Sequence, residues 1–411
     1  MSATIVVGAG QAAAAFAAKL RELQPDRAIK IIGEEPVLPY QRPPLSKKYM
    51  TGEMSLDRLL LRPAEWFAEH GIECRTGVAV DSIDRDEKAL VLSDETVLKY
   101  DRLLIATGAT PRRLASAAGG DLAGVYTLRT LADADAMAHE FEPGRRLLIV
   151  GGGYIGLEAA AVAASRGLEV TVVEMAPRIL QRVAAPATSD YFRALHRAHG
   201  VTVNENASLV RLAGDEGKVN RAEFADGSTL EIDFVLVGIG VLPNVSLAEE
   251  AGLATGNGIE VGPDCRTSDP AILAAGDCAS FAFRGQRIRL ESVQNAIEQA
   301  EAAARTVAGE AVDYRPVPWF WSDQYDVKLQ IAGHNMGYDA TVVRPGARAG
   351  QQSVWYFAGT QFLAVDAMND PRAYMMGKRL LEASVEPDRA SGKTITPEQA
   401  GDPDFDLKSL L

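Results

Sequence analysis

An α/β fold with two Rossmann-like dinucleotide-binding domains and a C-terminal α+β domain is predicted by three features of this 411-residue sequence. Two glycine-rich segments, at 4–34 and 147–174, each have the pattern of strand, tight turn, helix and strand. An apolar strand phrase, DRLLIATG at 101–108, returns as DFVLVGIG at 233–240. After Pro316 these units give way to an aromatic cluster and alternating strand patterns.

The first segment begins with an apolar strand at 4–7 and the turn GAGQAA at 8–13. Its first glycine allows a tight turn, and its second lets the backbone approach a pyrophosphate. The third position needs only a small side chain, so alanine serves at position 13. A helix to Leu23 follows, and its N-terminus would hold the phosphates. The strand at 29–32 leads to Glu34, where a ribose hydroxyl needs an acceptor, and the adjacent Glu35 is an alternative.

The second segment repeats this order with LLIVGGGYIG at 147–156, a helix and a strand that ends at Glu174, 21 residues after Gly153. A carboxylate at this place accepts from the 2′-hydroxyl of NADH and repels the 2′-phosphate of NADPH. NADH is therefore the predicted coenzyme. Arg178 and Arg182 follow closely and could recruit a phosphate, which leaves NADPH as the alternative.

The two halves of the chain keep the same order of parts. Gly151 follows Gly8 by 143 residues, Glu174 follows Glu34 by 140, and the second strand phrase follows the first by 132. A further apolar strand, ILAAGDCA at 272–279, has no counterpart in the first half. We therefore expect the second domain to be inserted in the first. The expected parts are 1–110 and 236–315 for the outer domain, 111–235 for the inserted domain and 316–411 for the C-terminal domain.

Three other stretches hold candidate residues. PVLPYQRPPLSKKYM at 36–50 is stiffened by its prolines until about Leu45, and Lys47 follows at an expected helix start, as an anion-binding residue or as part of a linker. Asp277 ends a strand and could accept from a sugar-like hydroxyl chain or simply form a turn. Trp319 and Trp321 share one face of a strand, either in the core or against a cofactor ring. A helix is expected at 288–307, strands at 327–332, 340–344, 352–358 and 361–366, and a last helix near 370–384.

Composition excludes several classes of function. The net charge of −13 argues against a nucleic-acid partner. The cysteines are Cys74, Cys265 and Cys278, with no C-x-x-C pair, so no disulfide framework, zinc site or other metal site is indicated, and a reducing cytoplasm fits best. The apolar stretch at 147–165 contains Glu158 and four glycines, which favours a buried strand–helix unit over a membrane span.

Several longer motifs make the family resemblance specific: PYQRPPLSK, DRLLIATGATPR, GGGYIGLE, TSDP followed by GDC, RLESVQNAIEQA and PWFWSDQY. With these motifs the chain resembles, over almost its whole length, the NADH-dependent, FAD-containing ferredoxin reductases of bacterial oxygenase systems, of the putidaredoxin reductase type. The resemblance implies a glutathione reductase-like arrangement of an FAD domain, an inserted NADH domain and a C-terminal domain.

The resemblance also implies the contacts of each cofactor. Lys47 would lie near flavin N5 and pair with Glu158, and these two are the implied catalytic residues. The other implied FAD contacts are Gly8, Gly10, Ala12, Ala13, Glu34, Arg42, Val80, Ala106, Thr107, Gly108, Arg129, Asp277 and Val293, with Trp319 or Trp321 bordering the ring. The implied NADH contacts are Gly151, Gly153, Tyr154, Ile155, Gly156, Glu158, Glu174, Arg182 and Gly240.

The expected activity is electron transfer from NADH through FAD to a 2Fe-2S ferredoxin that supplies an oxygenase, most simply a haem-thiolate monooxygenase. NADH gives up two electrons together and an iron–sulfur protein takes one, so a flavin is the needed converter. The absence of a cysteine pair argues against disulfide reductase chemistry. The absence of a cysteine between 35 and 60 argues against the related NADH oxidases and peroxidases.

Alternative hypotheses keep FAD as the cofactor and differ in the electron acceptor or in the role of the protein. The acceptor could be a rubredoxin or the ferredoxin of a ring-hydroxylating dioxygenase, and a redox-sensing flavoprotein resembling apoptosis-inducing factor is a third possibility. The resemblance implies a monomer or weak homodimer that meets its ferredoxin transiently, with no membrane partner. An acidic ferredoxin would need a basic patch, for which the candidates are Arg62, Arg284, Arg287, Arg289 and Lys378.

Overall fold

The computed structural model describes residues 3–385 and 394–410. The chain forms two compact units. Unit 1 comprises Met1–Arg42, Met54–Thr110 and Val241–Pro316, and unit 2 comprises Pro43–Glu53, Pro111–Gly240 and Val317–Leu411. The division into four stretches expected from the sequence, with boundaries after 110, 235 and 315, stays a prediction.

Unit 1 is built on a parallel sheet with strand order β20-β7-β1-β2-β3. Its strands are β1 (Ala3–Val7), β2 (Ala28–Gly33), β3 (Ile72–Thr76), β7 (Arg102–Ile105) and β20 (Ile272–Ala274). In β1, Val6 packs into the core on one face of the sheet, and Ile5 and Val7 into the core on the other. The central strands are thus buried on both faces, which explains their continuous apolar sequences.

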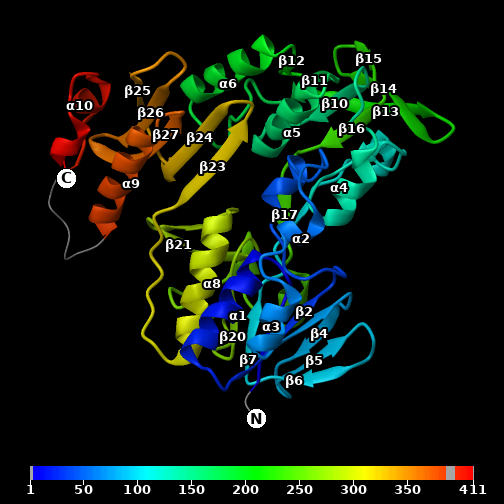
Figure 1. Cartoon of the computed structure of the whole chain (residues 1–411), viewed down its shortest axis with the longest axis vertical. Coiled ribbons are helices and arrows are strands. Elements are labelled where there is room, and N and C mark those ends of the chain that lie inside the picture. Colours follow the sequence, from blue (N-terminus) through cyan, green and yellow to red (C-terminus); the bar gives the residue numbers. More distant parts are fainter. Residues whose placement is uncertain (1–2, 386–393, 411) are drawn as a thin grey trace. The chain divides into compact units, whose positions relative to one another are not determined.

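One face of this sheet is covered by α1 (Gln11–Leu23) and α8 (Val293–Ala308), which pack side by side (Figure 1). Alanines such as Ala13 and Ala300, both fully buried, let the two helices approach closely. The helix expected from residue 288 begins instead at Val293. The Ser292 hydroxyl accepts from the Asn295 N–H and caps it, and residues 286–288 form a strand.

The other face carries the antiparallel sheet of β4 (Val80–Asp84), β5 (Ala89–Leu92) and β6 (Val97–Lys99). The remaining elements of unit 1 are smaller. They are α2 (Leu56–Leu59), α3 (Ala64–Glu69), α7 (Ser246–Glu250), the sheet of β18 (Thr255–Gly256), β19 (Gly258–Glu260), β21 (Ala279–Phe283) and β22 (Gln286–Ile288), and the strand pair β8 (Ala109–Pro111) and β17 (Val241–Pro243).

Unit 2 contains a second parallel sheet, with strand order β12-β11-β10-β16-β9. Its strands are β9 (Val125–Tyr126), β10 (Arg146–Val150), β11 (Glu169–Glu174), β12 (Thr202–Glu205) and β16 (Phe234–Val237). The order β11-β10-β16 repeats the order β2-β1-β7 of unit 1, so the duplication expected from the sequence is confirmed. One face packs against the antiparallel sheet of β13 (Leu209–Asp215), β14 (Lys218–Phe224) and β15 (Thr229–Glu231).

The helices of this part of unit 2 are α4 (Leu131–Ala138), α5 (Tyr154–Ser165) and α6 (Pro186–Ala198), with 3-10 turns η1 (Pro43–Ser46) and η2 (Ser116–Ala118). A capping box between Thr130 and Asp133 starts α4. The segment 43–53 joins this unit because η1 packs on α5, and because the Tyr49 hydroxyl donates to Asp135 of α4 at 2.8 Å.

The C-terminal part of unit 2 is an antiparallel sheet with order β23-β24-β27-β26-β25. Its strands are β23 (Trp319–Gln324), β24 (Val327–Gly333), β25 (Ala340–Pro345), β26 (Gln352–Ala358) and β27 (Gln361–Met368), followed by α9 (Pro371–Val385), α10 (Pro397–Gly401) and η4 (Leu407–Leu410). The strands and the helix expected here are confirmed to within two residues. Trp355 and Phe357 of β26 form the centre of this core.

A buried polar cluster joins this sheet to α6. The Thr188 hydroxyl donates to the Asp366 carboxylate at 2.7 Å, and the Tyr356 hydroxyl also donates to it. The Tyr356 oxygen in turn accepts from the Ala185 N–H at 2.8 Å. Burial raises the pKa of Asp366 to about 6.

The two parallel sheets, together with the C-terminal antiparallel sheet and its helix, confirm the predicted fold class. Among the residues described, no helix combines the length and apolar character needed to span a membrane.

Candidate functional site

The glycine-rich turn of unit 1 fits a bound pyrophosphate. Gly8 has φ +108°, and a Cβ there would lie 2.2 Å from the Ala106 carbonyl oxygen, so only glycine is accommodated. A Cβ at Gly10 would meet open space, and Gly10 caps α1 without a side-chain hydrogen bond. The first N–H groups of α1 are therefore left for an anion, as FAD requires.

The two acidic residues after β2 differ in their partners. Glu35 accepts from the Tyr40 hydroxyl at 2.6 Å and pairs with Arg42, also at 2.6 Å. Glu34 is exposed, and its carboxylate accepts no hydrogen bond from the part of the chain described. This difference favours Glu34 as the ribose acceptor, the role that the sequence assigned to it, and gives Arg42 a structural partner.

Two strand ends and the residues after them lie near this turn. At the end of β7, the Thr107 hydroxyl donates to the Asn244 carbonyl at 2.8 Å and the Asn244 amide donates back to the Thr107 carbonyl at 2.9 Å. Gly276, after β20, has φ +83°, and a Cβ there would lie 3.3 Å from the Ala12 side chain. Thr107 and Gly276 are thus held at the same edge of the sheet as the turn. The other expected residues of unit 1 are Ala13 in α1, Val80 at the start of β4, Ala106 and Gly108 beside Thr107, Asp277 after Gly276, and Val293 at the start of α8.

Unit 2 repeats the pyrophosphate cradle. Gly151 has φ +109°, and a Cβ there would lie 2.4 Å from the Gly238 carbonyl oxygen. A Cβ at Gly156 would lie 2.4 Å from the Gly151 carbonyl oxygen, so the helix packs as closely as the motif requires. Gly153 faces open space and caps α5 without a side-chain bond. These residues fit the phosphates of NADH.

Glu174 is held in place by backbone groups. Its two carboxylate oxygens accept from the Gly152 and Ala176 N–H groups, each at 2.8 Å. Arg178 is turned away to donate to the Ser189 hydroxyl at 2.6 Å, whereas Arg182 is exposed, with its guanidinium 3.3 Å from where a Cβ of Gly240 would be. The ordering of Glu174 and the engagement of Arg178 both favour NADH over NADPH.

Lys47 and Glu158 form the ion pair that the resemblance implied. The Lys47 Nζ lies 3.1 Å from Glu158 Oε1, and their side chains are 19% and 9% exposed. Lys47 comes directly after η1, and Glu158 lies on the buried face of α5. Burial raises the pKa of Glu158, opposed by the Lys47 ammonium and by a hydrogen bond from Ser322.

Strand β23 separates its side chains onto two faces. Trp319 and Trp321 share one face, with ring centroids 5.7 Å apart, and the Lys378 ammonium lies 5.2 Å from the Trp319 ring. The opposite face meets α5: the Phe320 ring lies 4.9 Å from the Tyr154 ring, and Ser322 Oγ donates to Glu158 Oε1 at 2.8 Å.

Other residues implied for the cofactors lie in unit 2. Tyr154 is partly buried, and burial of its hydroxyl raises its pKa well above the usual range, while the Ile155 side chain beside it is exposed. Arg129 precedes α4, and its N–H donates to the Asp133 carboxylate. The roles of Arg129, Trp319 and Trp321 toward the flavin stay predictions.

Sequence reasoning did not single out the polar neighbours of Glu158. Ser46 Oγ lies 3.4 Å from Glu158 Oε2, and Asp323 lies 3.9 Å from Lys47. Ser322 and Gln324 share a face of β23 by the period-two rule, and two polar residues on one face of an aromatic strand were the signal available.

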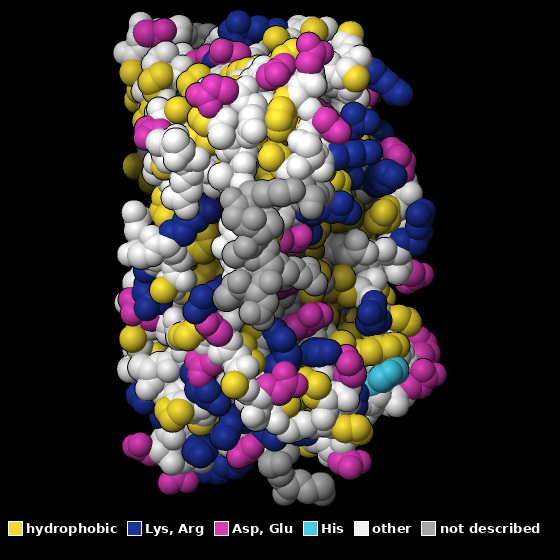
Figure 2. All heavy atoms as spheres, turned by 90° about the vertical axis from the view of Figure 1, so that its left-hand side faces the viewer, with side chains coloured by type: hydrophobic (Ala, Val, Ile, Leu, Met, Phe, Trp, Pro, Cys, Tyr) yellow, Lys and Arg dark blue, Asp and Glu magenta, His cyan; other side chains and the backbone are white. Residues whose placement is uncertain are grey.

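The candidate basic patch contains one error. Arg289 is not an open surface cation, because its side chain is only 7% exposed, pairs with Glu291 at 2.7 Å and donates to the Asp277 carbonyl at 3.2 Å. Arg287 donates to the Ser280 carbonyl at 2.8 Å. Figure 2 shows basic and acidic side chains interspersed over the face in view.

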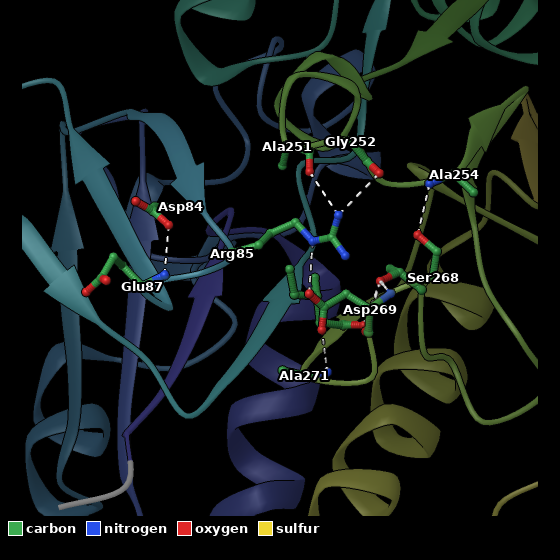
Figure 3. Close-up of polar contacts among 11 residues, drawn as sticks. Asp84, Arg85, Glu87, Ala251, Gly252, Ala254, Ser268, Asp269 and Ala271 are labelled. Carbon is green, nitrogen blue, oxygen red and sulfur yellow. Dashed lines mark hydrogen bonds and ion pairs between the residues drawn. The ribbon is translucent and has the colours of Figure 1, made fainter.

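The TSDP motif is a structural clamp (Figure 3). Arg85, beyond the end of β4, donates through Nε to Asp269 Oδ2 at 2.9 Å and through Nη1 to the carbonyls of Ala251 and Gly252 at 3.4 Å. Asp269 also accepts from the Ala271 N–H at 2.9 Å. These bonds hold the loop before β20 against the end of α7.

The cysteines form no redox pair. Cys265 and Cys278 are buried, Cys74 is partly buried, and all three are free. Burial raises the pKa of Cys74 to about 11 and that of Cys265 to about 12, so both are thiols at neutral pH.

Known proteins share this architecture and sequence. The profile of the pyridine nucleotide-disulphide oxidoreductase family matches residues 2–300, and that of the reductase C-terminal family matches residues 319–411. The chain is 42% identical over 411 residues to a ferredoxin–NAD(P)⁺ reductase of a Sphingomonas species, covering 99% of this chain and 97% of that protein. It is 41% identical over 409 residues to rhodocoxin reductase of Rhodococcus erythropolis, covering 99% and 94%. The crystal structure of the covalent putidaredoxin reductase–putidaredoxin complex matches with a TM-score of 0.94 and 37% identity, covering 100% of this chain and 98% of that chain.

Proposed function

Because the chain belongs to the pyridine nucleotide-disulphide oxidoreductase family, we propose that it is a ferredoxin reductase that carries electrons from NADH through FAD to a 2Fe-2S ferredoxin of an oxygenase system. The observation that carries this proposal is the pair of dinucleotide cradles at Gly8 and Gly151 in a chain without a cysteine pair. Such a chain takes hydride from a nicotinamide and has no dithiol to receive the electrons, so they pass to another protein.

The chain's own residues bind and orient the two nucleotides. The N-termini of α1 and α5 would hold the pyrophosphates, and Glu34 and Glu174 would accept from the ribose hydroxyls. When bound, FAD accepts two electrons from NADH together and passes them on singly. Free cysteines and dependence on NADH support a cytoplasmic location.

Lys47 and Glu158 are proposed as the catalytic pair. The Lys47 ammonium supplies a fixed positive charge in a partly buried place, and Glu158 holds that ammonium at 3.1 Å. Beside a bound flavin, where the family resemblance puts it, this ammonium would favour negative charge on the flavin. Ser46 and Ser322 hold the carboxylate from two sides.

The test is stopped-flow reduction of a panel of ferredoxins by the holoenzyme, with NADH and NADPH in parallel. We expect rapid reduction of at least one 2Fe-2S ferredoxin, with NADH preferred. Ferricyanide as acceptor is the control that isolates flavin reduction from ferredoxin reduction. If NADH bleaches the flavin and ferricyanide is reduced while no 2Fe-2S ferredoxin is, the proposed acceptor is wrong.

The panel also addresses the terminal partner. The likeness to a reductase solved in complex with putidaredoxin supports a ferredoxin as acceptor, and a haem-thiolate monooxygenase stays the predicted terminal partner. Faster reduction of a rubredoxin or of a dioxygenase ferredoxin would replace that partner and leave the NADH and FAD chemistry unchanged.

A further inference from the structure

A chain of buried side chains leads from Glu158 through β23 to α6. Ser322 Oγ donates to Glu158 Oε1 at 2.8 Å, and Gln324 Nε2 donates to Ser322 Oγ at 3.1 Å. Gln324 Oε1 lies 2.8 Å from His196 Nε2, and the Tyr325 hydroxyl lies 3.3 Å from His196 Nδ1. Ser322, Gln324 and His196 are fully buried.

All hydrogen bonds in this series of side chains run in the same direction, from Tyr325 toward Glu158. A hydroxyl has one proton to donate, and Ser322 must give it to Glu158 because its oxygen already accepts from the Gln324 amide. The amide keeps that orientation because its oxygen accepts from the His196 Nε2–H. His196 Nδ1 then accepts from the Tyr325 hydroxyl. Burial lowers the pKa of His196, which favours the neutral imidazole that this pattern uses.

Glu158 is a buried carboxylate, and its charged form is favoured by a hydrogen-bond donor such as the Ser322 hydroxyl. The charged and titratable groups around it are Lys47 after η1, Asp323 on β23, which lies 3.9 Å from Lys47, and Tyr154 one helical turn earlier on α5. Lys47 favours the carboxylate, while burial and the Asp323 charge oppose it. The hydrogen bond from Ser322 to the ionised form acts with Lys47 and lowers the pKa of Glu158 against the effect of burial.

We propose that Gln324 and His196 are positioning residues that keep Glu158 ionised and directed at Lys47, by fixing Ser322 as its hydrogen-bond donor. This rests on the proposed function of the Lys47–Glu158 pair. These hydrogen bonds fix the orientation of each side chain. They do not conduct a proton, because the neutral Gln324 amide lies in the middle of the series. The assignment gives a buried histidine far along the sequence a role in the chemistry at Glu158.

The test replaces Gln324 with Met, which removes both bonds and keeps the length of the side chain. We expect the pH midpoint for ionisation of Glu158 to rise by about one unit, the size of one hydrogen bond to a charged group. Two readouts report this midpoint in the FAD-loaded protein. One is the acid limb of the rate of flavin reduction by NADH, and the other is the infrared carbonyl stretch of protonated Glu158, obtained by subtracting the matching variant with Glu158→Gln.

A control separates this role from a general effect of the change. Gln361→Met makes the same replacement at an exposed end of β27, so it should retain the wild-type midpoint. Gln324→Glu keeps the side-chain shape and should also raise the midpoint, because its carboxylate accepts the hydrogen bond that the Ser322 hydroxyl otherwise donates to Glu158. Gln324→Glu replaces Gln324→Met as the test variant if Gln324→Met does not fold.

Failure of the positioning role of Gln324 and failure of the catalytic role of Glu158 give different results. If Glu158→Gln abolishes the acid limb while Gln324→Met and Gln324→Glu keep the wild-type midpoint in both readouts, the positioning role is wrong and the catalytic pair stands. If Glu158→Gln leaves the rate profile unchanged, the catalytic role of Glu158 is wrong, and the infrared midpoint alone decides whether Gln324 controls its charge.

Discussion

Replacing Lys47 with Met should slow flavin reduction more than it weakens FAD retention. Lys47 and Glu158 lie 3.1 Å apart and are both mostly buried. At an effective dielectric constant of about 20, two unit charges at this distance attract by about 5 kcal/mol. Desolvation cancels part of this, so we expect a net loss of about 3 kcal/mol when one partner is removed.

That loss predicts a change in the charge of Glu158. Loss of the Lys47 ammonium raises the pKa of Glu158 further, from a value that burial already raises. The carboxyl group then keeps its proton to a higher pH than in the wild-type protein. We expect the rate of flavin reduction by NADH to fall by about 10- to 100-fold, while the FAD content changes little.

Anaerobic stopped-flow measurement of flavin bleaching gives the rate, and the absorbance of the purified protein gives the FAD content. The double variant Lys47→Met, Glu158→Gln is the matched control, because it removes the unpaired charge together with its partner. It should recover most of the thermal stability lost in Lys47→Met and none of the rate. Normal rates in the holoenzyme together with loss of FAD from Lys47→Met would refute the assigned role.

Three further changes test other parts of the structure. The folded-state pKa of about 6 for Asp366 lies above its ordinary 3.8, so the folded protein binds the proton more tightly and stability falls by about 3 kcal/mol as pH rises through this window. Asp366→Asn should flatten this fall in thermal melts at pH 4 to 6, and an unchanged slope would contradict it. Glu174→Ser should raise the NADPH-to-NADH ratio of kcat/KM by at least about tenfold, measured by steady-state kinetics, and an unchanged ratio would remove its role in selectivity. Arg85→Met should lower the thermal midpoint by about 3 °C without changing flavin reduction, because it removes the clamp on the loop before β20.

Features made by residues close together in the sequence could be predicted from it, whereas contacts between distant residues could not. The cradles at Gly8 and Gly151 are made within a few consecutive residues, so spacing alone predicted them, and the glycines have the positive φ values that the motif requires. The pairing of Lys47 with Glu158 joins residues 111 positions apart, and only the family resemblance supplied it.

The remaining differences arise where distant elements meet. Nothing local indicates which face of β23 meets α5, so Ser322 and Gln324 were left as ordinary strand residues. His196 lies on α6, and its contact with Gln324 joins residues 128 positions apart. Arg289 has the local sequence of a surface cation, but the Asp277 carbonyl and Glu291 hold it in a buried place.

The interleaved chain also determines when each nucleotide cradle is finished during synthesis. The outer parallel sheet has β20 at one edge, and β20 and Gly276 are translated only after the whole stretch 111–240. A ribosome that has reached residue 240 has therefore made every strand of the inserted parallel sheet, while the outer sheet still lacks its last strand. The outer nucleotide-binding sheet is consequently completed late in synthesis, although its first glycine-rich motif is among the earliest residues translated.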